Sequence, residues 1–285
     1  MDPCANSGSH SIFRRIWFSE DSSIGRRLKQ FVAFVVPTPL LVAAKKRYYL
    51  ALLENPQTPR EADMEVLNQI VQPGDFALDI GAFVGFYTQR LSQLVGASGE
   101  VWAFEPVPET FSMLSYVVRK LSLNNVRMLN LALSDCDGEA IMEIPRYRRG
   151  GECLYNARIV LPRSASHRRA ILIHRRALDS LLASGPCRTV SLMKLDVEYH
   201  ELHTVRGALA TIRRDHPVIL MELLGTADTA NSRSKLLNML AAQGYQAFRC
   251  ADGRFVPCAP DENCQNRFFL TQTHIAKLAP YVRWH

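Results

Sequence analysis

The stretch FALDIGAFVGFYT at residues 76–88 decides the fold of this chain. Its first part, Phe76 to Ile80, is a short apolar run typical of a buried strand. Gly81 and Gly85 then interrupt the run before a helical pattern of apolar residues begins. Strand, glycine turn and helix together predict the first half of a nucleotide-binding βα unit. In such a unit the glycines let the backbone approach a ligand, and the helix N-terminus offers N–H groups.

Two acidic residues at predicted strand ends indicate which ligand this unit binds. Asp79 lies on the last turn of the first strand, where its carboxylate repels a dinucleotide pyrophosphate but attracts the ammonium and sulfonium groups of S-adenosylmethionine (SAM). The glycine spacing also differs from the G-x-G-x-x-G of dinucleotide enzymes. Glu105 ends the next strand, where a βαβ unit places its ribose-binding acid. A nicotinamide-dependent Rossmann enzyme, or a Glu105 that only precedes a proline on a solvated loop, are the alternatives.

Four motifs of the chain resemble those of the FkbM family of SAM-dependent methyltransferases. They are DIGAFVGFYT at 79–88, AFEP at 103–106, ALSD at 132–135 and MKLDVE at 193–198. The resemblance runs from about Val71 to Leu223, with a weaker tail to Thr271. It implies an α/β fold, the Rossmann-like seven-stranded sheet of class I methyltransferases, in the order 3-2-1-4-5-7-6 and mostly parallel with a C-terminal antiparallel hairpin. It also implies SAM as cofactor and O-methylation of a hydroxyl on a sugar, glycolipid or other small molecule.

Two positions depart from the family's pattern. Family members usually carry Asn where Phe83 stands and Gly where Tyr199 stands. The first departure affects the expected contacts with SAM, and the second affects the shape of the acceptor pocket. A catalytically inactive domain that only binds SAM is therefore an alternative to an active enzyme.

The strand ends and the resemblance together give the candidate site residues. The resemblance points to Lys194, Asp196 and Glu198 as catalytic residues at the end of a fourth strand, residues 190–196. His200 is a further candidate, because an imidazole suits the removal of a hydroxyl proton. Asp196 as a helix N-cap, and both His200 and His203 as surface residues, are the structural interpretations. The expected cofactor-binding residues are Asp79, Gly81, Ala82, Gly85, Thr88, Glu105, Ser134 and Asp135.

The rest of the domain follows the same alternation of strands and helices. A fifth strand, 216–222, ends in Glu222, which is expected to face the same crevice as Asp196. Two carboxylates are too few to define a metal site, so no metal is expected. Asp135 is followed either by a crevice-lining loop or by a hairpin turn into residues 139–144. An amphipathic helix at 232–243 and two final strands at 245–250 and 267–271, joined by a loop, complete the prediction.

Composition narrows the choice of partners. The 285 residues are 47% hydrophobic, enough for one large α/β domain with an appendage. Seven scattered cysteines without a C-x-x-C pair predict reduced thiols in a cytoplasmic protein, with neither a disulfide framework nor a zinc site. The arginine-rich residues 146–176 are predicted to be a solvated loop or a clamp on an acidic group of the acceptor. Because stacking aromatics do not accompany them, nucleic acid is not an expected partner.

Residues 1–60 are predicted to be an N-terminal extension, partly disordered and then helical, ahead of a methyltransferase domain at 61–285. An apolar run at 31–44 is too short to span a bilayer and contains two prolines. Basic residues flank the run on both sides. The segment 26–47 is therefore interpreted either as a helical cap on the domain or as a peripheral membrane contact.

Overall fold

A computed structural model gives the fold, and it describes residues 38–145, 154, 157–160, 169–185, 188–223, 230–259, 262 and 264–284. The first part of the segment 26–47, up to residue 37, lies outside the described residues. Within the described ranges no helix has both the length and the apolar character needed to cross a membrane.

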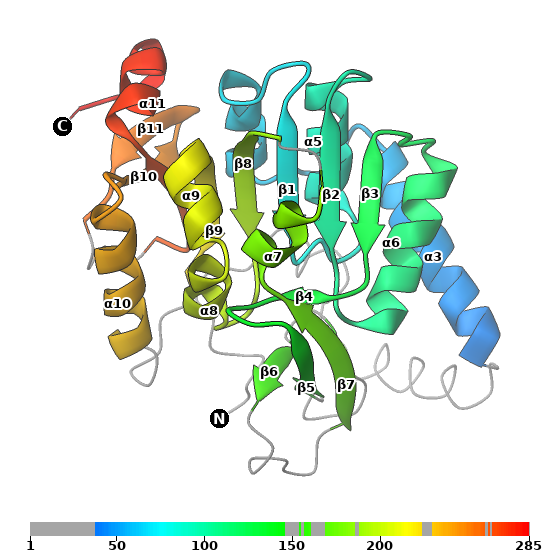
Figure 1. The fold of residues 1–285 in the computed structure, drawn as a ribbon. Coiled ribbons are helices and arrows are strands. Elements are labelled where there is room, and N and C mark those ends of the chain that lie inside the picture. The colour runs from blue at the N-terminus through cyan, green and yellow to red at the C-terminus, as the bar shows by residue number, and fades with distance from the viewer. Residues whose placement is uncertain are drawn as a thin grey trace, which may run out of the picture.

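The centre of the molecule is an eight-stranded sheet in the order β11-β10-β12-β9-β8-β1-β2-β3 (Figure 1). Its strands are β1 (Phe76–Ile80), β2 (Glu100–Phe104), β3 (Val126–Leu129), β8 (Val190–Leu195), β9 (Val218–Glu222), β10 (Gln246–Ala251), β11 (Arg254–Pro257) and β12 (Asn266–Leu270). The pairs from β3 to β9 are parallel, whereas β12 pairs antiparallel with both of its neighbours, β9 and β10. The predicted class I methyltransferase order is therefore confirmed.

The strand β11 is one more than the seven-stranded prediction, which placed a loop in this part of the chain. Asp252 and Gly253 both have positive φ, of 52° and 70°, and they turn the chain back onto β10. Arg249 then pairs with Val256 in an antiparallel register. An Asp-Gly dipeptide between two apolar runs favours this tight hairpin, because both of its residues tolerate the left-handed conformation.

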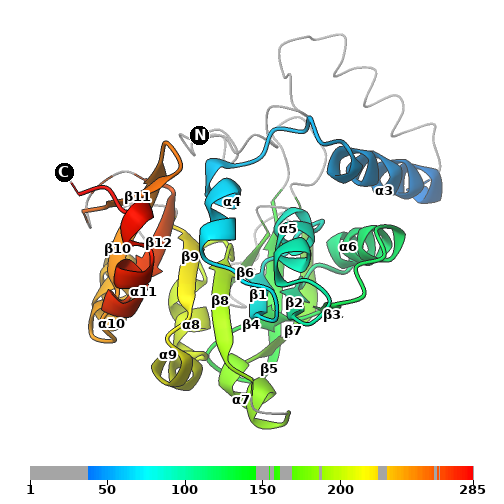
Figure 2. The same cartoon turned by 90° about the horizontal axis from the view of Figure 1, so that it is seen from above.

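Helices cover both faces of the sheet (Figure 2). One face carries α4 (Ala62–Glu65), the 3-10 turn η1 (Val66–Gln69), α5 (Phe86–Val95) and α11 (Gln272–Lys277), and the other carries α7 (Leu178–Ala183), α8 (Glu201–Arg206), α9 (Leu209–Asp215) and α10 (Ala230–Ala241). Along β1, Ala77 packs in the apolar cluster on the face that carries α5, and Leu78 packs in the cluster on the face that carries α8. The strand is buried on both faces, which explains its continuous apolar sequence.

A second, four-stranded sheet lies beside the carboxyl ends of β2, β3 and β8 (Figure 1). It contains β4 (Ala132–Leu133), β7 (Arg169–Arg176), β5 (Gly138–Ile144) and β6 (Arg158–Val160), in that order. The hairpin predicted at 135–138 is wrong, because β7 inserts between β4 and β5. The solvated loop predicted for 146–176 is wrong at 158–160 and 169–176, and its other residues lie outside the described ones apart from 154 and 157.

Three arginines of the segment that was predicted to be a solvated loop have acidic partners. Arg158 pairs with Glu143 at 3.5 Å, Arg176 pairs with Asp137 at 3.2 Å, and Arg169 bonds to Glu109. Between these charged groups, apolar side chains of β5 and β7 pack into a small core of their own. The apolar side chains therefore hold these strands together, and the arginines form ion pairs with acidic residues.

The helix α3 (Thr38–Glu54) is the described part of the N-terminal extension, and α6 (Pro108–Lys120) is its neighbour (Figure 2). The ring of Tyr49 meets the ring of Phe83 edge to face, with centroids 5.8 Å apart. Lys46 lies over the ring of Tyr116 at 6.0 Å from its centroid. This helix therefore contacts both α6 and the glycine turn. That it caps the acceptor site stays a prediction.

Candidate functional site

The glycine turn between β1 and α5 lies directly against the end of β8. Gly81 has a φ of 82°, and a Cβ atom there would stand 1.8 Å from the backbone oxygen of Asp196. Gly85 has a φ of 101° and caps α5, where a Cβ atom would stand 2.9 Å from the Leu114 side chain. Ala82 is buried and its N–H donates to the carbonyl of Phe104 at 2.9 Å. Only glycine fits at 81, because both the backbone angle and the space exclude a side chain.

Asp79 is fully buried at the end of β1. Its Oδ2 accepts a hydrogen bond of 2.6 Å from the hydroxyl of Thr88, which is itself buried. Its Oδ1 is buried without a hydrogen-bond partner among the described residues. Burial raises the pKa of Asp79, and the nearby Lys194, its register partner on β8, opposes that rise. A buried carboxylate oxygen without a hydrogen-bond partner can accept a hydrogen bond from a cationic group of a ligand.

Glu105 follows β2 and fastens the glycine turn from the other side. Its carboxylate accepts the backbone N–H of Phe83 at 3.0 Å and that of Val107 at 2.8 Å. Burial raises the pKa of Glu105 to about 8, although both of these bonds lower it. Each carboxylate oxygen keeps a second lone pair, so the group can still accept from hydroxyls of a ligand.

The two departures from the resembling family occupy the same kind of backbone position. Phe83 has a φ of 50° and Tyr199 a φ of 70°, both in the left-handed region. Asn and Gly tolerate this region best, which explains why those residues are usual at the two positions. A larger side chain there costs roughly 1–2 kcal/mol. The backbone shape is thus retained, and Phe83 gains a ring contact with Tyr49 of α3.

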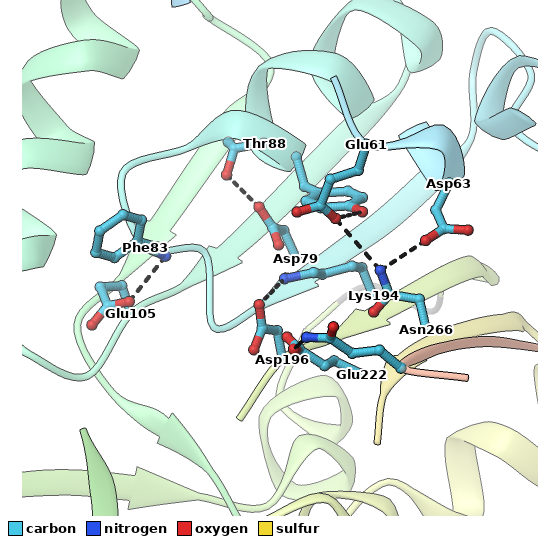
Figure 3. Close-up of polar contacts among 12 residues, drawn as sticks. Glu61, Asp63, Asp79, Phe83, Thr88, Glu105, Lys194, Asp196, Glu222 and Asn266 are labelled. Atoms are coloured by element: carbon cyan, nitrogen blue, oxygen red, sulfur yellow. Dashed lines mark hydrogen bonds and ion pairs between the residues drawn. The ribbon is translucent and has the colours of Figure 1, made fainter. Parts of the chain in front are cut away.

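Lys194 is a buried cation at the centre of the site (Figure 3). Its Nζ lies 3.1 Å from Oδ2 of Asp196 and 4.7 Å from the centroid of the Tyr87 ring. Burial lowers the pKa of Lys194, but the carboxylates of Asp196 and Asp79 more than offset this, so its pKa is raised. The ammonium group therefore stays charged and joins the cofactor side of the site to Asp196.

Glu222 and Asp196 lie together at neighbouring strand ends, as their positions in the sequence predicted. Burial, followed by the charge of Asp196 and a hydrogen bond with it, raises the pKa of Glu222 to about 9. Gln265 donates a hydrogen bond from its side chain to Glu222 on the other side. At neutral pH this carboxyl group therefore holds a proton that it shares with the neighbouring carboxylate.

Other polar residues around this site were not found from the sequence. The hydroxyl of Tyr87 donates to Glu61 at 2.9 Å, and Asn266 donates to Asp63 at 2.7 Å (Figure 3). Glu61 and Asp63 precede the first strand, whereas Asn266 begins β12. No local pattern joins residues so far apart in the chain. Tyr87 lies within the motif that drew attention to the glycine turn, but its apolar ring gave no hint of a polar role.

Ser134 and Asp135 form a separate cluster with two histidines. Ser134 Oγ lies 3.0 Å from Nε2 of His200, and Asp135 Oδ2 lies 2.7 Å from Nδ1 of His203. The two imidazoles are stacked, with centroids 4.8 Å apart. Burial, together with the charge of His203, lowers the pKa of His200 to about 4. His200 is therefore neutral at pH 7 and is positioned by a buried serine.

The turn after β8 separates this cluster from Asp196. The interpretation of Asp196 as a helix N-cap is wrong, because α8 begins at Glu201 and has His200 as its N-cap residue. Glu198 adopts a left-handed φ of 46° and is partly exposed. The carboxylate of Glu201 accepts the N–H of Tyr199 at 3.0 Å. The side chain of Asp196 is consequently not used for capping and remains with Lys194 and Glu222.

Comparisons with known proteins give one family and several distant folds. A sequence model of the Methyltransferase FkbM domain matches residues 79–247. A solved structure of the methyltransferase FkbM from Methylobacillus flagellatus KT has 16% identity and a TM-score of 0.46, covering 72% of this chain and 52% of that chain. This chain thus spans about half the length of that protein. No curated protein matches the chain.

Two other solved structures are similarly remote. The SAM-dependent O-methyltransferase from Thermotoga maritima has 12% identity and a TM-score of 0.39, covering 74% of this chain and 64% of that one. Fibrillarin from Aeropyrum pernix, with S-adenosyl-L-methionine natively bound, has 15% identity and a TM-score of 0.41, covering 73% and 72%.

Proposed function

The chain belongs to the FkbM family of methyltransferases, whose cofactor is SAM, and from this premise we propose that it methylates a hydroxyl oxygen of a small-molecule or glycan acceptor. The observation that carries the proposal is the contact of Lys194, Asp196 and Glu222 at the strand ends beside the glycine turn. Among these groups, the carboxylate of Asp196 can receive a hydroxyl proton next to the position where the cofactor is expected.

The residues around the glycine turn fit SAM. Asp79 Oδ1 is an unpartnered buried oxygen and would take the ammonium of the methionine part. Glu105 keeps lone pairs for ribose hydroxyls, and the bare backbone at Gly81 and Gly85 leaves room for close approach. We place Ser134 and Asp135, with the neighbouring Ala82 and Thr88, among the residues that shape this site. SAM, when bound, supplies an electrophilic methyl group on its sulfonium sulfur.

The acceptor hydroxyl must lose its proton, since a neutral alcohol is a weak nucleophile. Asp196 is the group proposed to accept this proton, and Lys194 Nζ, 3.1 Å from its Oδ2, can stabilise the charge that develops. Glu222 holds a hydrogen bond to the same carboxylate and fixes its orientation. Glu198, on the turn that follows, is proposed to orient or deprotonate the acceptor hydroxyl together with Asp196. A positioned base of this kind typically contributes about 10²–10⁴ in rate.

The charges on the acceptor side support a neutral acceptor with several hydroxyl groups. Carboxyl groups line this side of the site: Glu61, Asp196 and Glu222 interact with Lys194, and Asp63 accepts a hydrogen bond from Asn266. The ionised ones repel a phosphate or carboxylate on an acceptor, and carboxyl oxygens in either protonation state accept hydrogen bonds from sugar hydroxyls. This pattern is the reason for preferring a sugar, glycolipid or related polyol over an acidic acceptor.

Transfer of labelled methyl from SAM to a panel of hydroxylated glycans and lipids tests the proposal. Asp196→Asn and Glu198→Gln should lower turnover by about 10²–10⁴ while leaving SAM affinity within a few fold of the wild type. His200→Gln is the matched control, since its imidazole bonds to Ser134. A comparable loss in this control, with both acid variants active, would move the base role to His200.

The same assay separates enzyme from binding module. A domain that binds SAM without turnover is the alternative, because Phe83 and Tyr199 are unusual residues at left-handed backbone positions. Undiminished SAM binding with no labelled product from any acceptor or cell extract would favour that module. Tight binding of NAD without binding of SAM would instead favour a nicotinamide enzyme.

A further inference from the structure

Two cysteines, Cys258 and Cys264, have neighbouring sulfur atoms and lie between β11 and β12 in the chain. Their Sγ atoms lie 2.7 Å apart, one residue after β11 and two residues before β12. Both are free thiols in the structure. A disulfide bond joins sulfurs at about 2.05 Å, so only a small movement separates this pair from a covalent bond.

Hydrogen bonds of Ala259, Glu262 and Cys264 hold the residues next to the two thiols in place. The carboxylate of Glu262 accepts the N–H of Ala259 at 3.2 Å and pairs with Arg249 at 2.6 Å. The backbone oxygen of Glu262 accepts both the N–H of Cys264 at 3.0 Å and a guanidinium N–H of Arg267 at 2.6 Å. These bonds tie residues beside the two sulfurs to one another, so the entropy of bringing the thiols together has already been lost on folding.

The surroundings distinguish the roles of the two sulfurs. Cys258 is only 7% exposed, and burial raises the pKa of its thiol to about 12. Cys264 is half-buried and therefore more accessible to a small reagent. The guanidinium of Arg233 interacts with both sulfurs, and that of Arg267 interacts with Cys258.

We propose that Cys258 and Cys264 are an oxidisable dithiol that closes to an intramolecular disulfide by exchange with a small-molecule disulfide. The thiolate of Cys264 attacks one sulfur of oxidised glutathione and releases one glutathione thiolate. Cys258 then loses its proton, attacks the sulfur of Cys264 and displaces the second glutathione. The protein gives up two electrons and two protons, and one glutathione disulfide becomes two molecules of glutathione.

The bond would fix the segment that leads into the acceptor side of the methyltransferase site. Gln265 follows Cys264 directly, and its side chain donates to Glu222 while its backbone oxygen accepts the N–H of Leu223 at 2.8 Å. The inference about the disulfide itself does not depend on methyl transfer. It is measured on the protein as a covalent change.

Peptide mapping of the full chain tests the proposal, because cleavage after Arg254 and Arg267 leaves both cysteines in the single peptide 255–267. The protein is incubated with oxidised glutathione, its remaining thiols are alkylated, and it is digested without reduction. We expect this peptide to carry no alkyl group and to weigh two hydrogens less than its reduced form. A peptide with two alkyl groups, or with a lasting glutathione adduct, would overturn the proposal.

Single variants identify the roles of the two sulfurs. Cys258→Ser should trap glutathione on Cys264, because no second thiol can resolve the mixed disulfide. Cys264→Ser should show neither the internal bond nor substantial glutathione on the buried Cys258. Cys250→Ser is the matched control and should form the internal bond as the wild type does. Loss of the bond in this control, with the fold intact by circular dichroism, would contradict the assigned pair.

Discussion

Removing the charge of Asp79 without changing its shape separates binding of the cofactor from stability of the fold. In Asp79→Asn the amide oxygen can still accept the hydrogen bond of 2.6 Å from Thr88. The negative charge of the unpartnered Oδ1 is lost. Lys194 keeps Asp196 as its partner at 3.1 Å, so the neighbouring ion pair survives.

The size of the expected loss follows from the bond that disappears. A hydrogen bond between charged groups is worth about 1.5–3 kcal/mol, and each 1.4 kcal/mol is a factor of ten, so SAM should bind about 10- to 150-fold more weakly. Stability should move the other way. The folded pKa of Asp79 is raised, so in the wild type its contribution falls as pH rises from the unfolded pKa through the folded pKa. The variant lacks this loss and should melt no lower than the wild type at pH 7.

Calorimetric titration with S-adenosylhomocysteine and thermal melting measure the two effects on the same samples. Asp63→Asn is the matched control, because its carboxyl is also largely buried and bonds to Asn266 at 2.7 Å outside the glycine turn. The control should keep its affinity within about threefold of the wild type. Equal affinities for wild type and Asp79→Asn, or equal losses in both variants, would refute the assignment of Asp79 to the ammonium of SAM.

Three further outcomes are expected. Gly81→Ala should lower the melting temperature much more than Gly96→Ala does. Both glycines have positive φ, but only at Gly81 would the added Cβ atom clash with a backbone atom, at 1.8 Å; equal shifts would contradict the close packing. The kcat/KM of the wild type should fall as pH rises through the pKa of about 9 of Glu222, because the deprotonated group no longer donates to Asp196, and Glu222→Gln should lose that limb; an unchanged pH profile would exclude the coupling. Tyr49→Ala should cost about 1 kcal/mol of unfolding free energy by losing its ring contact; denaturant titration with no change would show that the contact is without effect.

Local patterns were sufficient to predict where Asp79, Gly81 and Glu105 lie in the fold. Asp79 and Gly81 lie two residues apart at one strand end, and Glu105 follows the next strand, so their positions depended only on the βα rhythm of the chain. Lys194 and Asp196 were likewise predicted on one face, because alternate residues of a strand share a face.

Contacts between distant segments were not predictable in this way. Glu61 and Asn266 lie 205 residues apart and meet only because β12 inserts beside β9. The strand β7 was not predicted, because its arginines suggested a solvated loop. In the structure Arg169 and Arg176 instead form ion pairs with acidic residues, at the two ends of an apolar strand. The helix N-cap predicted at Asp196 failed for a related reason, since the left-handed turn that follows β8 delays the start of α8.

The destination of the methyl group tests the proposed chemistry most directly. SAM with a carbon-13-labelled methyl group is incubated with the protein and a cell extract, and the labelled products are examined by NMR and mass spectrometry. Methylation by the site of Lys194, Asp196 and Glu222 predicts a labelled methyl ether on a neutral, polyhydroxylated acceptor, and this product should disappear with Asp196→Asn. A labelled methyl on nitrogen or carbon, or an ether that forms equally well with Asp196→Asn, would contradict it.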